Sequence, residues 1–357
     1  MALDRKFSII TATFNSERTL EKCLTAIRAQ TYPQNLVEIL VVDGGSTDKT
    51  REIANRFQCR IVENPRVEPM TAKLLGLKEA TGEFLMHVDS DEVLESPRAL
   101  EKRLAAFLEN PEVAMVFSTG YANPPGAPFA ARYINEFGDP FSMFYYRLSK
   151  DYRRFISSMR KLHRVRKETS DYVVFELNEG PQPILTNEAC GNCIDLKFFR
   201  KNFSHLFDKP DGPTLFFYHM QKLTKSFAIT KDDAIFHFSA DHWRTFLLKI
   251  RWRVRNNIFF PADMGASAFG GRVEFDTHAV RLKKYLYMPY AFLLLPALFD
   301  AVYLAWTRKD AYYLLHFPLT LYTASLIAGM MVLKVCGYRA QLTSYGGQKA
   351  IPKGNHL

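Results

Sequence analysis

The sequence has 357 residues and a formal net charge of +10. This length allows one large domain with an appendage, and the positive charge favours anionic partners such as phosphorylated substrates or a membrane surface. Five scattered cysteines contain a single C-x-x-C, Cys190 to Cys193, without the second ligand pair that a zinc site needs. The first residues contain no signal-peptide core, so we expect this end of the chain to lie in the cytoplasm.

Strand-like and helix-like segments alternate from residue 7 to residue 117. The predicted strands are residues 7–11, 37–42, 60–63, 84–88 and 113–117. The predicted helices are residues 16–30, with Ser16 as N-cap, a second that ends near 57, 70–81 and 97–109. This alternation predicts an α/β layer with a mostly parallel sheet.

Polar residues follow three of the predicted strands. Asn15, Asp43 and the pair Asp89 and Asp91 all lie at carboxyl ends, where ligands bind in sheets of this kind. Two carboxylates one residue apart can present both side chains to one hard cation, which in turn can hold a diphosphate. The alternative is that this pair caps the helix that follows it.

The character of the sequence changes after residue 124. Residues 129–166 mix aromatic and basic residues, which fits either a solvated helix face or a surface that contacts anionic lipid. Residues 243–260 have an apolar stripe at helical spacing with five basic residues elsewhere on the helix. This pattern predicts a basic amphipathic helix, which lies at a membrane interface or packs on the protein core.

Two long apolar segments follow, residues 286–306 with one charged residue, Asp300, and residues 311–333 with none. Both reach the roughly 20 residues that are needed to cross hydrocarbon. We therefore expect two transmembrane or re-entrant helices within residues 285–338. The whole chain is predicted to divide into residues 1–120, 121–242, 243–284, 285–338 and a polar tail, 339–357.

The N-terminal third resembles glycosyltransferase family 2, which has the GT-A nucleotide-sugar fold. The matching text is FSIITATFN at 7–15, QTYP at 30–33, ILVVDGGSTD at 39–48, TAK at 71–73, ATGEF at 80–84 and VDSD at 88–91. The resemblance is specific over residues 5–120 and loose from there to about 260. It implies a Rossmann-like sheet flanked by helices and a nucleotide-sugar donor.

The resemblance also implies roles for particular residues. It makes nucleotide contacts of Thr11, Thr13, Asn15 and Asp43, and it places Lys73 and Asp89 toward the diphosphate. Asp89 and Asp91 would hold Mg²⁺ or Mn²⁺, with His237 either a third ligand or a core histidine. The family's acidic pair that supplies the catalytic base is reduced here to Asp211; Asp208 and Glu188 stay open as alternatives.

Together these features predict an inverting, metal-dependent glycosyltransferase on the cytoplasmic face of the inner or plasma membrane. Its donor would be a UDP- or GDP-sugar. Its acceptor would be lipid-linked, such as polyprenyl phosphate or a polyprenyl-diphosphate-linked glycan, in cell-surface polysaccharide or glycoconjugate synthesis. Nucleic acid is not an expected partner, and a homo-oligomer is possible. The alternatives are a processive polysaccharide synthase, a sugar nucleotidyltransferase and a non-catalytic membrane scaffold.

Overall fold

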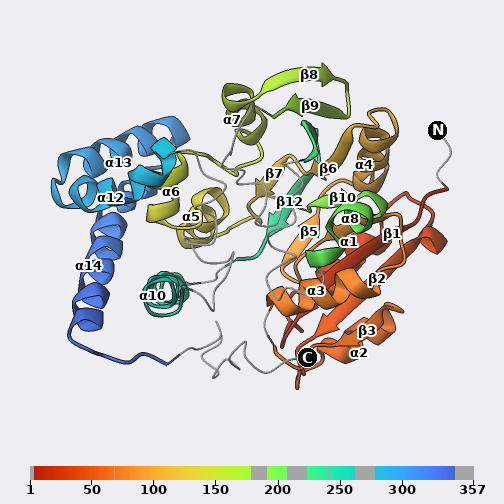
Figure 1. Cartoon of the computed structure of the whole chain (residues 1–357), viewed down its shortest axis with the longest axis horizontal. Helices are drawn as coiled ribbons and strands as arrows, with labels where there is room; N and C mark the ends of the chain where they lie inside the picture. The colour runs from red at the N-terminus through yellow and green to blue at the C-terminus, as the bar shows by residue number, and fades with distance from the viewer. Residues whose placement is uncertain are drawn as a thin grey trace. The chain divides into compact units, whose positions relative to one another are not determined.

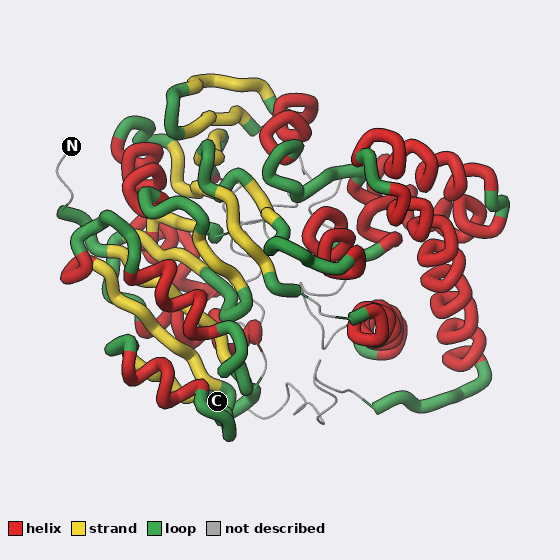
Figure 2. The backbone as a smooth tube through the Cα atoms, turned by 180° about the vertical axis from the view of Figure 1, so that it is seen from behind, coloured by secondary structure: helices red, strands yellow, loops and turns green. Residues whose placement is uncertain are grey.

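The computed structural model describes residues 4–67, 69–177, 191–206, 223–239, 242–261 and 278–341. Within these ranges the chain forms two compact units. The first unit comprises the described residues up to 124 and those within 150–177, 191–206 and 223–238, and it contains the strands (Figure 1). The second unit comprises residues 125–149 and the described residues from 239 onward, and it is helical (Figure 2).

A large sheet forms the centre of the first unit. Its order is β3-β2-β1-β4-β10-β6-β11-β9-β8. The strands are β1 (Phe7–Thr13), β2 (Val37–Asp43), β3 (Arg60–Glu63), β4 (Phe84–His87), β6 (Val113–Phe117), β8 (Arg164–Glu168), β9 (Tyr172–Glu176), β10 (Cys193–Asp195) and β11 (Ser226–Thr230). β1 pairs in parallel with both β2 and β4, whereas β10 runs antiparallel between β4 and β6. The α/β prediction with a mostly parallel sheet is therefore confirmed.

The helices of this unit pack apolar residues against the sheet. They are α1 (Leu20–Arg28), α2 (Thr50–Arg56), α3 (Pro69–Glu79), α4 (Ala99–Leu108), α7 (Phe155–Leu162) and α8 (Leu196–Phe203), with short 3-10 turns η1 (Gln34–Leu36) and η3 (Ser204–Leu206). Leu24 of α1 and Leu100 of α4 belong to one buried core with Ile9 of β1. α3 approaches β1 so closely that a Cβ on Gly76 would lie 2.5 Å from Ile10.

A second, three-stranded sheet was not predicted. It consists of β5 (Glu92–Leu94), β12 (Ala234–His237) and β7 (Gly120–Ala122) in the order β5-β12-β7. β12 pairs antiparallel with β5, which sets His237 opposite Glu92. The segment after Asp91 is thus a strand, so the alternative that the acidic pair caps a helix directly after it is wrong.

Two other boundaries differ from the prediction. α1 begins at Leu20 rather than near Ser16, and the Ser16 hydroxyl accepts a hydrogen bond from Ser90 instead of capping the helix. Residues 129–166 are not one solvated helix face: they form α5 (Phe129–Phe137), α6 (Pro140–Tyr146), α7 and part of β8. Nearly all of α5 is buried, because its aromatic residues pack into the core of the second unit.

The second unit consists of α5, α6, α10 (Trp243–Phe259), α12 (His278–Phe292), α13 (Leu295–Arg308), the 3-10 turn η6 (Ala311–Leu315) and α14 (His316–Val335). α10 is the predicted basic amphipathic helix, but its apolar stripe is covered. Phe246, Ile250 and Val254 are buried in one cluster with Leu319 and Met330 of α14. Packing on the core, rather than contact with a membrane, therefore explains this stripe.

The two apolar segments at the end of the chain differ from each other. The first is not a single spanning helix, because residues 281–292 and 295–308 form two helices that meet at 90°. Leu294 at the break has a φ of +64°, and Pro296 follows in the first turn of α13, where its missing N–H costs nothing. The second segment, Ala311–Val335, is long and apolar enough to cross a membrane.

Candidate active site

The carboxyl ends of β1, β2 and β4 meet at one edge of the large sheet. β1 lies between the other two, with Thr13 opposite Asp43 on one side and Ile10 opposite His87 on the other. The loops that follow these strands are joined by a hydrogen bond of 3.1 Å between the Ser90 and Ser16 hydroxyls. The structure therefore brings the predicted strand-end residues into one region.

Asp43 is held by a closed set of hydrogen bonds in the turn after β2. One carboxylate oxygen accepts from the hydroxyls of Thr13 (3.0 Å) and Ser46 (2.5 Å), and the other accepts from the Ser46 amide (3.0 Å) and from Arg51 (3.4 Å). These contacts use about all the lone pairs that a carboxylate offers. Its side chain is fully buried, so its predicted contact with a nucleotide requires exchange of one of these partners.

The other nucleotide-contact candidates differ in their exposure. The Thr11 hydroxyl is buried and has no hydrogen-bond partner among the residues that the structure describes, and Thr13 donates to Asp43. Asn15 is exposed and has a φ of +50°, a conformation that asparagine adopts more readily than most residues. Its side-chain oxygen accepts from the Thr47 backbone N–H at 2.9 Å, and its backbone N–H donates to the Ser46 hydroxyl at 2.8 Å. Of the four candidates, Asn15 is exposed, whereas Thr11, Thr13 and Asp43 are buried.

The two carboxylates after β4 turn toward different partners. Asp89 lies 3.3 Å from the Lys73 ammonium of α3, and Asp91 lies 3.5 Å from Nε2 of His237. Each aspartate side chain is 36% exposed, so neither points into the hydrophobic core. Burial alone would lower the pKa of Lys73, but the carboxylates of Asp89, Glu92 and Asp91 raise it above its ordinary value. Lys73 thus stays a cation beside the acidic pair.

Glu92 is a site residue that the sequence analysis missed. It is fully buried and accepts hydrogen bonds from the Tyr121 hydroxyl at 2.6 Å and from the Asp89 amide at 3.0 Å. Burial and the neighbouring Asp89 raise its pKa to about 7. The Tyr121 ring in turn stacks on His237, with centroids 4.6 Å apart. Glu92 and Tyr121 therefore fix both the Asp89 turn and the histidine, through strand pairings that no local sequence signal indicates.

The predicted three-residue metal site is not present as such. Among the residues that the structure describes, no three His, Cys, Asp or Glu side chains are grouped closely enough to hold an ion. The reason is that Asp89 turns to Lys73, which leaves Asp91 and His237 as a pair. A partly exposed carboxylate beside an imidazole nitrogen fits Mn²⁺ or Mg²⁺ if a diphosphate and water supply the other ligands.

The predicted catalytic base, Asp211, lies outside the described residues, as do its alternatives Asp208 and Glu188. The described chain resumes at Gly191, which has a φ of +56°. Its carbonyl accepts two hydrogen bonds from Arg103 of α4, both 3.3 Å, and the next carbonyl, of Asn192, accepts from the His87 amide at 3.0 Å. The start of β10 is therefore fastened to the end of β4.

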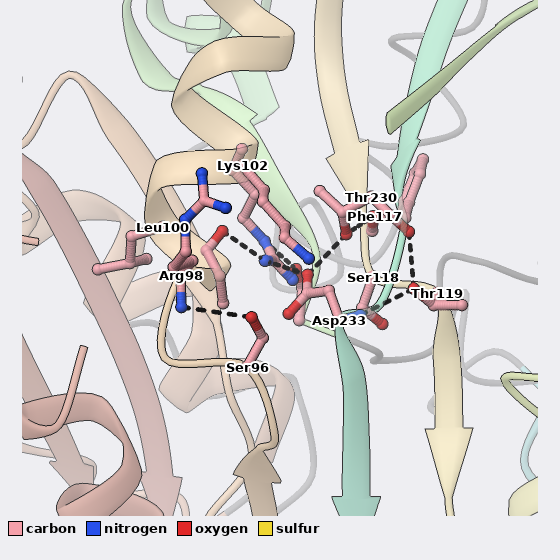
Figure 3. Close-up of polar contacts among 12 residues, drawn as sticks. Ser96, Arg98, Leu100, Lys102, Phe117, Ser118, Thr119, Thr230 and Asp233 are labelled. Carbon is pink, nitrogen blue, oxygen red and sulfur yellow. Dashed lines mark hydrogen bonds and ion pairs between the residues drawn. The ribbon is translucent and has the colours of Figure 1, made fainter. Parts of the chain in front are cut away.

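Arg103 itself belongs to a buried polar cluster. It pairs with Asp233 at 2.5 Å, and both side chains are fully buried. Asp233 also accepts from the Thr230 hydroxyl at 2.6 Å, and its amide donates to Thr119 (Figure 3). This cluster joins α4, β11 and the start of β12. Because β12 ends in His237, the cluster helps to hold the strand that carries this histidine.

Residues 8–164 match the sequence model of glycosyl transferase family 2. This segment belongs to that family. Glycosyltransferase AglE of Haloferax volcanii is 34% identical over 90 residues, which are 24% of this chain and 30% of AglE. Dolichyl N-acetyl-alpha-D-glucosaminyl phosphate 3-beta-D-2,3-diacetamido-2,3-dideoxy-beta-D-glucuronosyltransferase of Methanococcus voltae is 37% identical over 86 residues, 22% of this chain and 27% of that relative. The match thus spans less than a third of each of these relatives.

A solved structure has a similar fold over most of the chain. It is the mannosyltransferase PcManGT from Pyrobaculum calidifontis in complex with GDP-Man and Mn²⁺. The TM-score is 0.52 at 16% identity, and the alignment covers 94% of this chain and 88% of that one. The likeness is one of fold and extends beyond the segment that the family model matches.

Proposed function

We propose that the protein is an inverting, metal-dependent glycosyltransferase that moves a sugar from a UDP- or GDP-sugar to a lipid-linked acceptor at a membrane. The observation that carries this proposal is the meeting of Asn15, Asp89 and Asp91 at one sheet edge, in a segment that belongs to glycosyl transferase family 2. A nucleotide diphosphate bound there would lie where ligands bind in open α/β sheets.

The donor would be bound by residues from three loops. Asn15 and the turn that covers Asp43 would contact the nucleoside. Thr11 and Thr13, which are buried next to this turn, would complete the nucleoside site. Lys73 would face the diphosphate, because its ammonium already lies beside Asp89 at the entrance to this region. PcManGT, whose fold is similar, binds GDP-Man, which supports a nucleotide sugar as the donor class.

Asp91 and His237 would hold Mg²⁺ or Mn²⁺, and Asp89 would complete the site once the donor draws Lys73 away. Such a cation offsets the negative charge that grows on the departing nucleotide diphosphate. Glu92 and Tyr121 keep the carboxylate loop and the imidazole in place for this purpose. Asp211 is the proposed base that takes the proton of the acceptor.

The acceptor would be polyprenyl phosphate or a polyprenyl-diphosphate-linked glycan. The support is the apolar helices at the end of the chain, one of which has the length and composition of a membrane span. The Methanococcus voltae relative is named for a dolichyl phosphate substrate, which agrees with a lipid-linked acceptor. On this view the catalytic unit works on the cytoplasmic face of the membrane.

The proposal is tested by transfer of radiolabelled sugar from UDP- and GDP-sugars into extracted polyprenyl phosphates, with Mn²⁺ and with EDTA. We expect label in the lipid fraction, at one sugar per lipid, and its loss with the chelator. Long products would instead indicate a processive synthase, and release of pyrophosphate from NTP and sugar phosphate a nucleotidyltransferase. Absence of transfer with every donor and acceptor would contradict the proposal.

A further inference from the structure

The second unit exposes an apolar surface that we call the apolar face. It consists of exposed large apolar side chains of α12, α13, η6 and the end of α14: Leu282, Tyr285, Leu286, Phe292, Leu293, Leu294, Leu295, Leu298, Phe299, Val302, Tyr303, Trp306, Tyr312, Leu314, Met331, Val332, Leu333, Val335 and Tyr338. Most exposed large apolar side chains of the described chain lie in this set. Exposed apolar side chains on helices that contact one another, as α12, α13, η6 and α14 do, mark contact with a membrane or another protein.

α13 contributes one side of its circumference to the apolar face. Ala297, Asp300, Ala301 and Leu304 are buried in the unit, whereas Leu295, Phe299 and Trp306 are 75%, 71% and 77% exposed. With 14 residues α13 is about 21 Å long, and it meets the preceding helix at 90°. Neither helix of this pair can cross the roughly 30 Å of hydrocarbon in a bilayer.

α14 is long enough to cross a membrane, but the helices packed against it argue against a spanning position. Buried residues recur along it from His316 to Met330, about 21 Å of its length. The helices that cover this side carry charges: Glu136 of α5 pairs with Arg308, Arg147 after α6 pairs with Asp300, and α10 bears Arg253. In Figures 1 and 2, α5, α6 and α10 all lie on the same side of α14. A crossing α14 would draw these charged helices into hydrocarbon.

The chemistry around the apolar face matches the headgroup region of a bilayer. Exposed Tyr285, Trp306, Tyr312 and Tyr338 have the amphipathic rings that gather at the lipid–water boundary. Lys309, Lys334 and Arg339 are exposed beside them, which favours anionic headgroups over an apolar protein surface. A lipid leaflet is therefore a better match to this surface than a second copy of the chain.

We propose that the apolar face inserts into one leaflet of a phospholipid bilayer and that none of the described helices of the second unit crosses it. The elbow between α12 and α13, with Phe292 to Leu295 at its tip, enters the acyl region. α14 lies along the same leaflet, so both of its ends stay on the cytoplasmic side. This inference rests on the proposed membrane-bound function and specifies how the protein is attached to the membrane.

Cysteine labelling distinguishes insertion into one leaflet from a spanning helix. Cys336 is exposed just after α14, whereas Cys23, Cys59 and Cys193 are buried. The full chain with Cys190→Ser reports on the end of α14 through Cys336. The same background with Cys336→Ser and Lys309→Cys reports on its start. Each is expressed in bacterial cells, and inside-out membrane vesicles are treated with a membrane-impermeant maleimide before and after detergent.

We expect both positions to label fully without detergent, in vesicles that retain the protein after flotation. Labelling of one position only after detergent would show that α14 crosses and would overturn the inference. Absence of the protein from floated vesicles would overturn it as well. Sugar transfer is measured on the same vesicles, so that the two proposals can fail separately. If α14 crosses the membrane and sugar is still transferred, only the attachment to one leaflet is wrong. If both positions label without detergent and no sugar is transferred, only the proposed function is wrong.

Variants of the apolar face test the surface itself. Leu295→Gln with Phe299→Gln should weaken binding of the purified chain to vesicles of 70% phosphatidylcholine and 30% phosphatidylglycerol roughly a hundredfold, about tenfold for each side chain. Leu108→Gln, at an exposed leucine of the first unit, is the matched control and should bind as the natural chain does. If the double variant bound normally, or only converted a dimer to a monomer, the leaflet would not be the partner of this face.

Discussion

At the scale of single residues, the candidate site is organised by hydrogen bonds among its own side chains. Asp89 and Asp91 were predicted to share one cation, but Asp89 pairs with Lys73 and Asp91 pairs with His237. This difference has a local cause, because α3 presents an ammonium group directly beside the first carboxylate. Under the proposed function, Asp91, next to the imidazole of His237, is then the residue on which cation binding would depend most.

We predict that Asp91→Asn lowers sugar transfer on the order of a hundredfold while the free energy of unfolding stays nearly unchanged. The substitution removes a charged ligand of a cation worth several kcal/mol to the reaction, but the side chain is partly exposed, and a pair of this exposure with His237 contributes about 1 kcal/mol or less to stability. Initial rates at saturating Mn²⁺ measure the effect. Asp4→Asn, at an exposed aspartate away from the sheet edge, is the control; equal rates for both variants would remove Asp91 from the mechanism.

Gly191 is constrained more tightly than Gly45, another glycine with positive φ. A Cβ there would lie 2.8 Å from both Ile235 and Met86 and 3.0 Å from Arg103, whereas a Cβ on Gly45 would meet nothing within 4 Å. Both glycines are left-handed, so alanine costs about 1–2 kcal/mol at either position. Gly191→Ala should cost about 1–3 kcal/mol more, from overpacking. Urea unfolding of the two variants measures this difference, and equal losses would contradict it.

At the scale of elements, the sequence was informative where the signal is local. The apolar runs of β1, β2 and β4 and the helices between them repeat within a few residues, so the alternation was predictable. β5, β7 and β12 were not, because three or four residues carry no periodicity and their pairings join segments far apart in sequence. The sequence allowed a kink at Pro296 but did not locate the break at Leu294, since a leucine run reads alike in a straight helix and in an elbow.

The site shows the same division. Asn15, Asp43, Asp89 and Asp91 follow strands that were predicted, so their convergence could be predicted too. The burial of Asp43 could not, because it depends on Ser46 and Arg51 closing over the carboxylate. Glu92 and Tyr121 were missed because their hydrogen bond depends on the small sheet. Asp211 stays a prediction from resemblance alone.

The ion pair of Arg103 and Asp233 joins α4 to the turn before β12, and we predict that Arg103→Met costs about 3–5 kcal/mol of unfolding free energy. The loss leaves the fully buried Asp233 carboxylate without its cation. Removal of one partner of a buried ion pair destabilises a protein much more than replacement of both partners. Adding Asp233→Asn should recover part of the loss. Arg160→Met, which breaks the exposed pair with Glu168, should cost less than about 1 kcal/mol. Comparable losses for the two single variants would mean that the pair does not fasten these elements.

At the scale of the whole molecule, the two units have different tasks under the proposed function. The first binds the donor at its sheet edge, and the second holds the chain at the lipid that carries the acceptor. A charge at the centre of a bilayer costs about 2.5–3.5 kcal/mol on insertion scales. The charged residues of α5, α10 and α13, with Asp139 and Arg147 at the two ends of α6, would together cost far more. Attachment to one leaflet therefore preserves the partly buried ion pairs of the second unit.

Donor binding should therefore stabilise the first unit selectively. UDP or GDP with Mn²⁺, at a hundred times the dissociation constant, stabilises the folded state that binds it by about 2.7 kcal/mol. We expect slower hydrogen exchange in residues 11–15, 43–47 and 89–94, with residues 278–341 unchanged, because only the first set surrounds the proposed diphosphate. EDTA should abolish the protection, and so should Asp91→Asn. Protection confined to the second unit, or protection that survives both treatments, would place the nucleotide elsewhere and remove the cation from its binding.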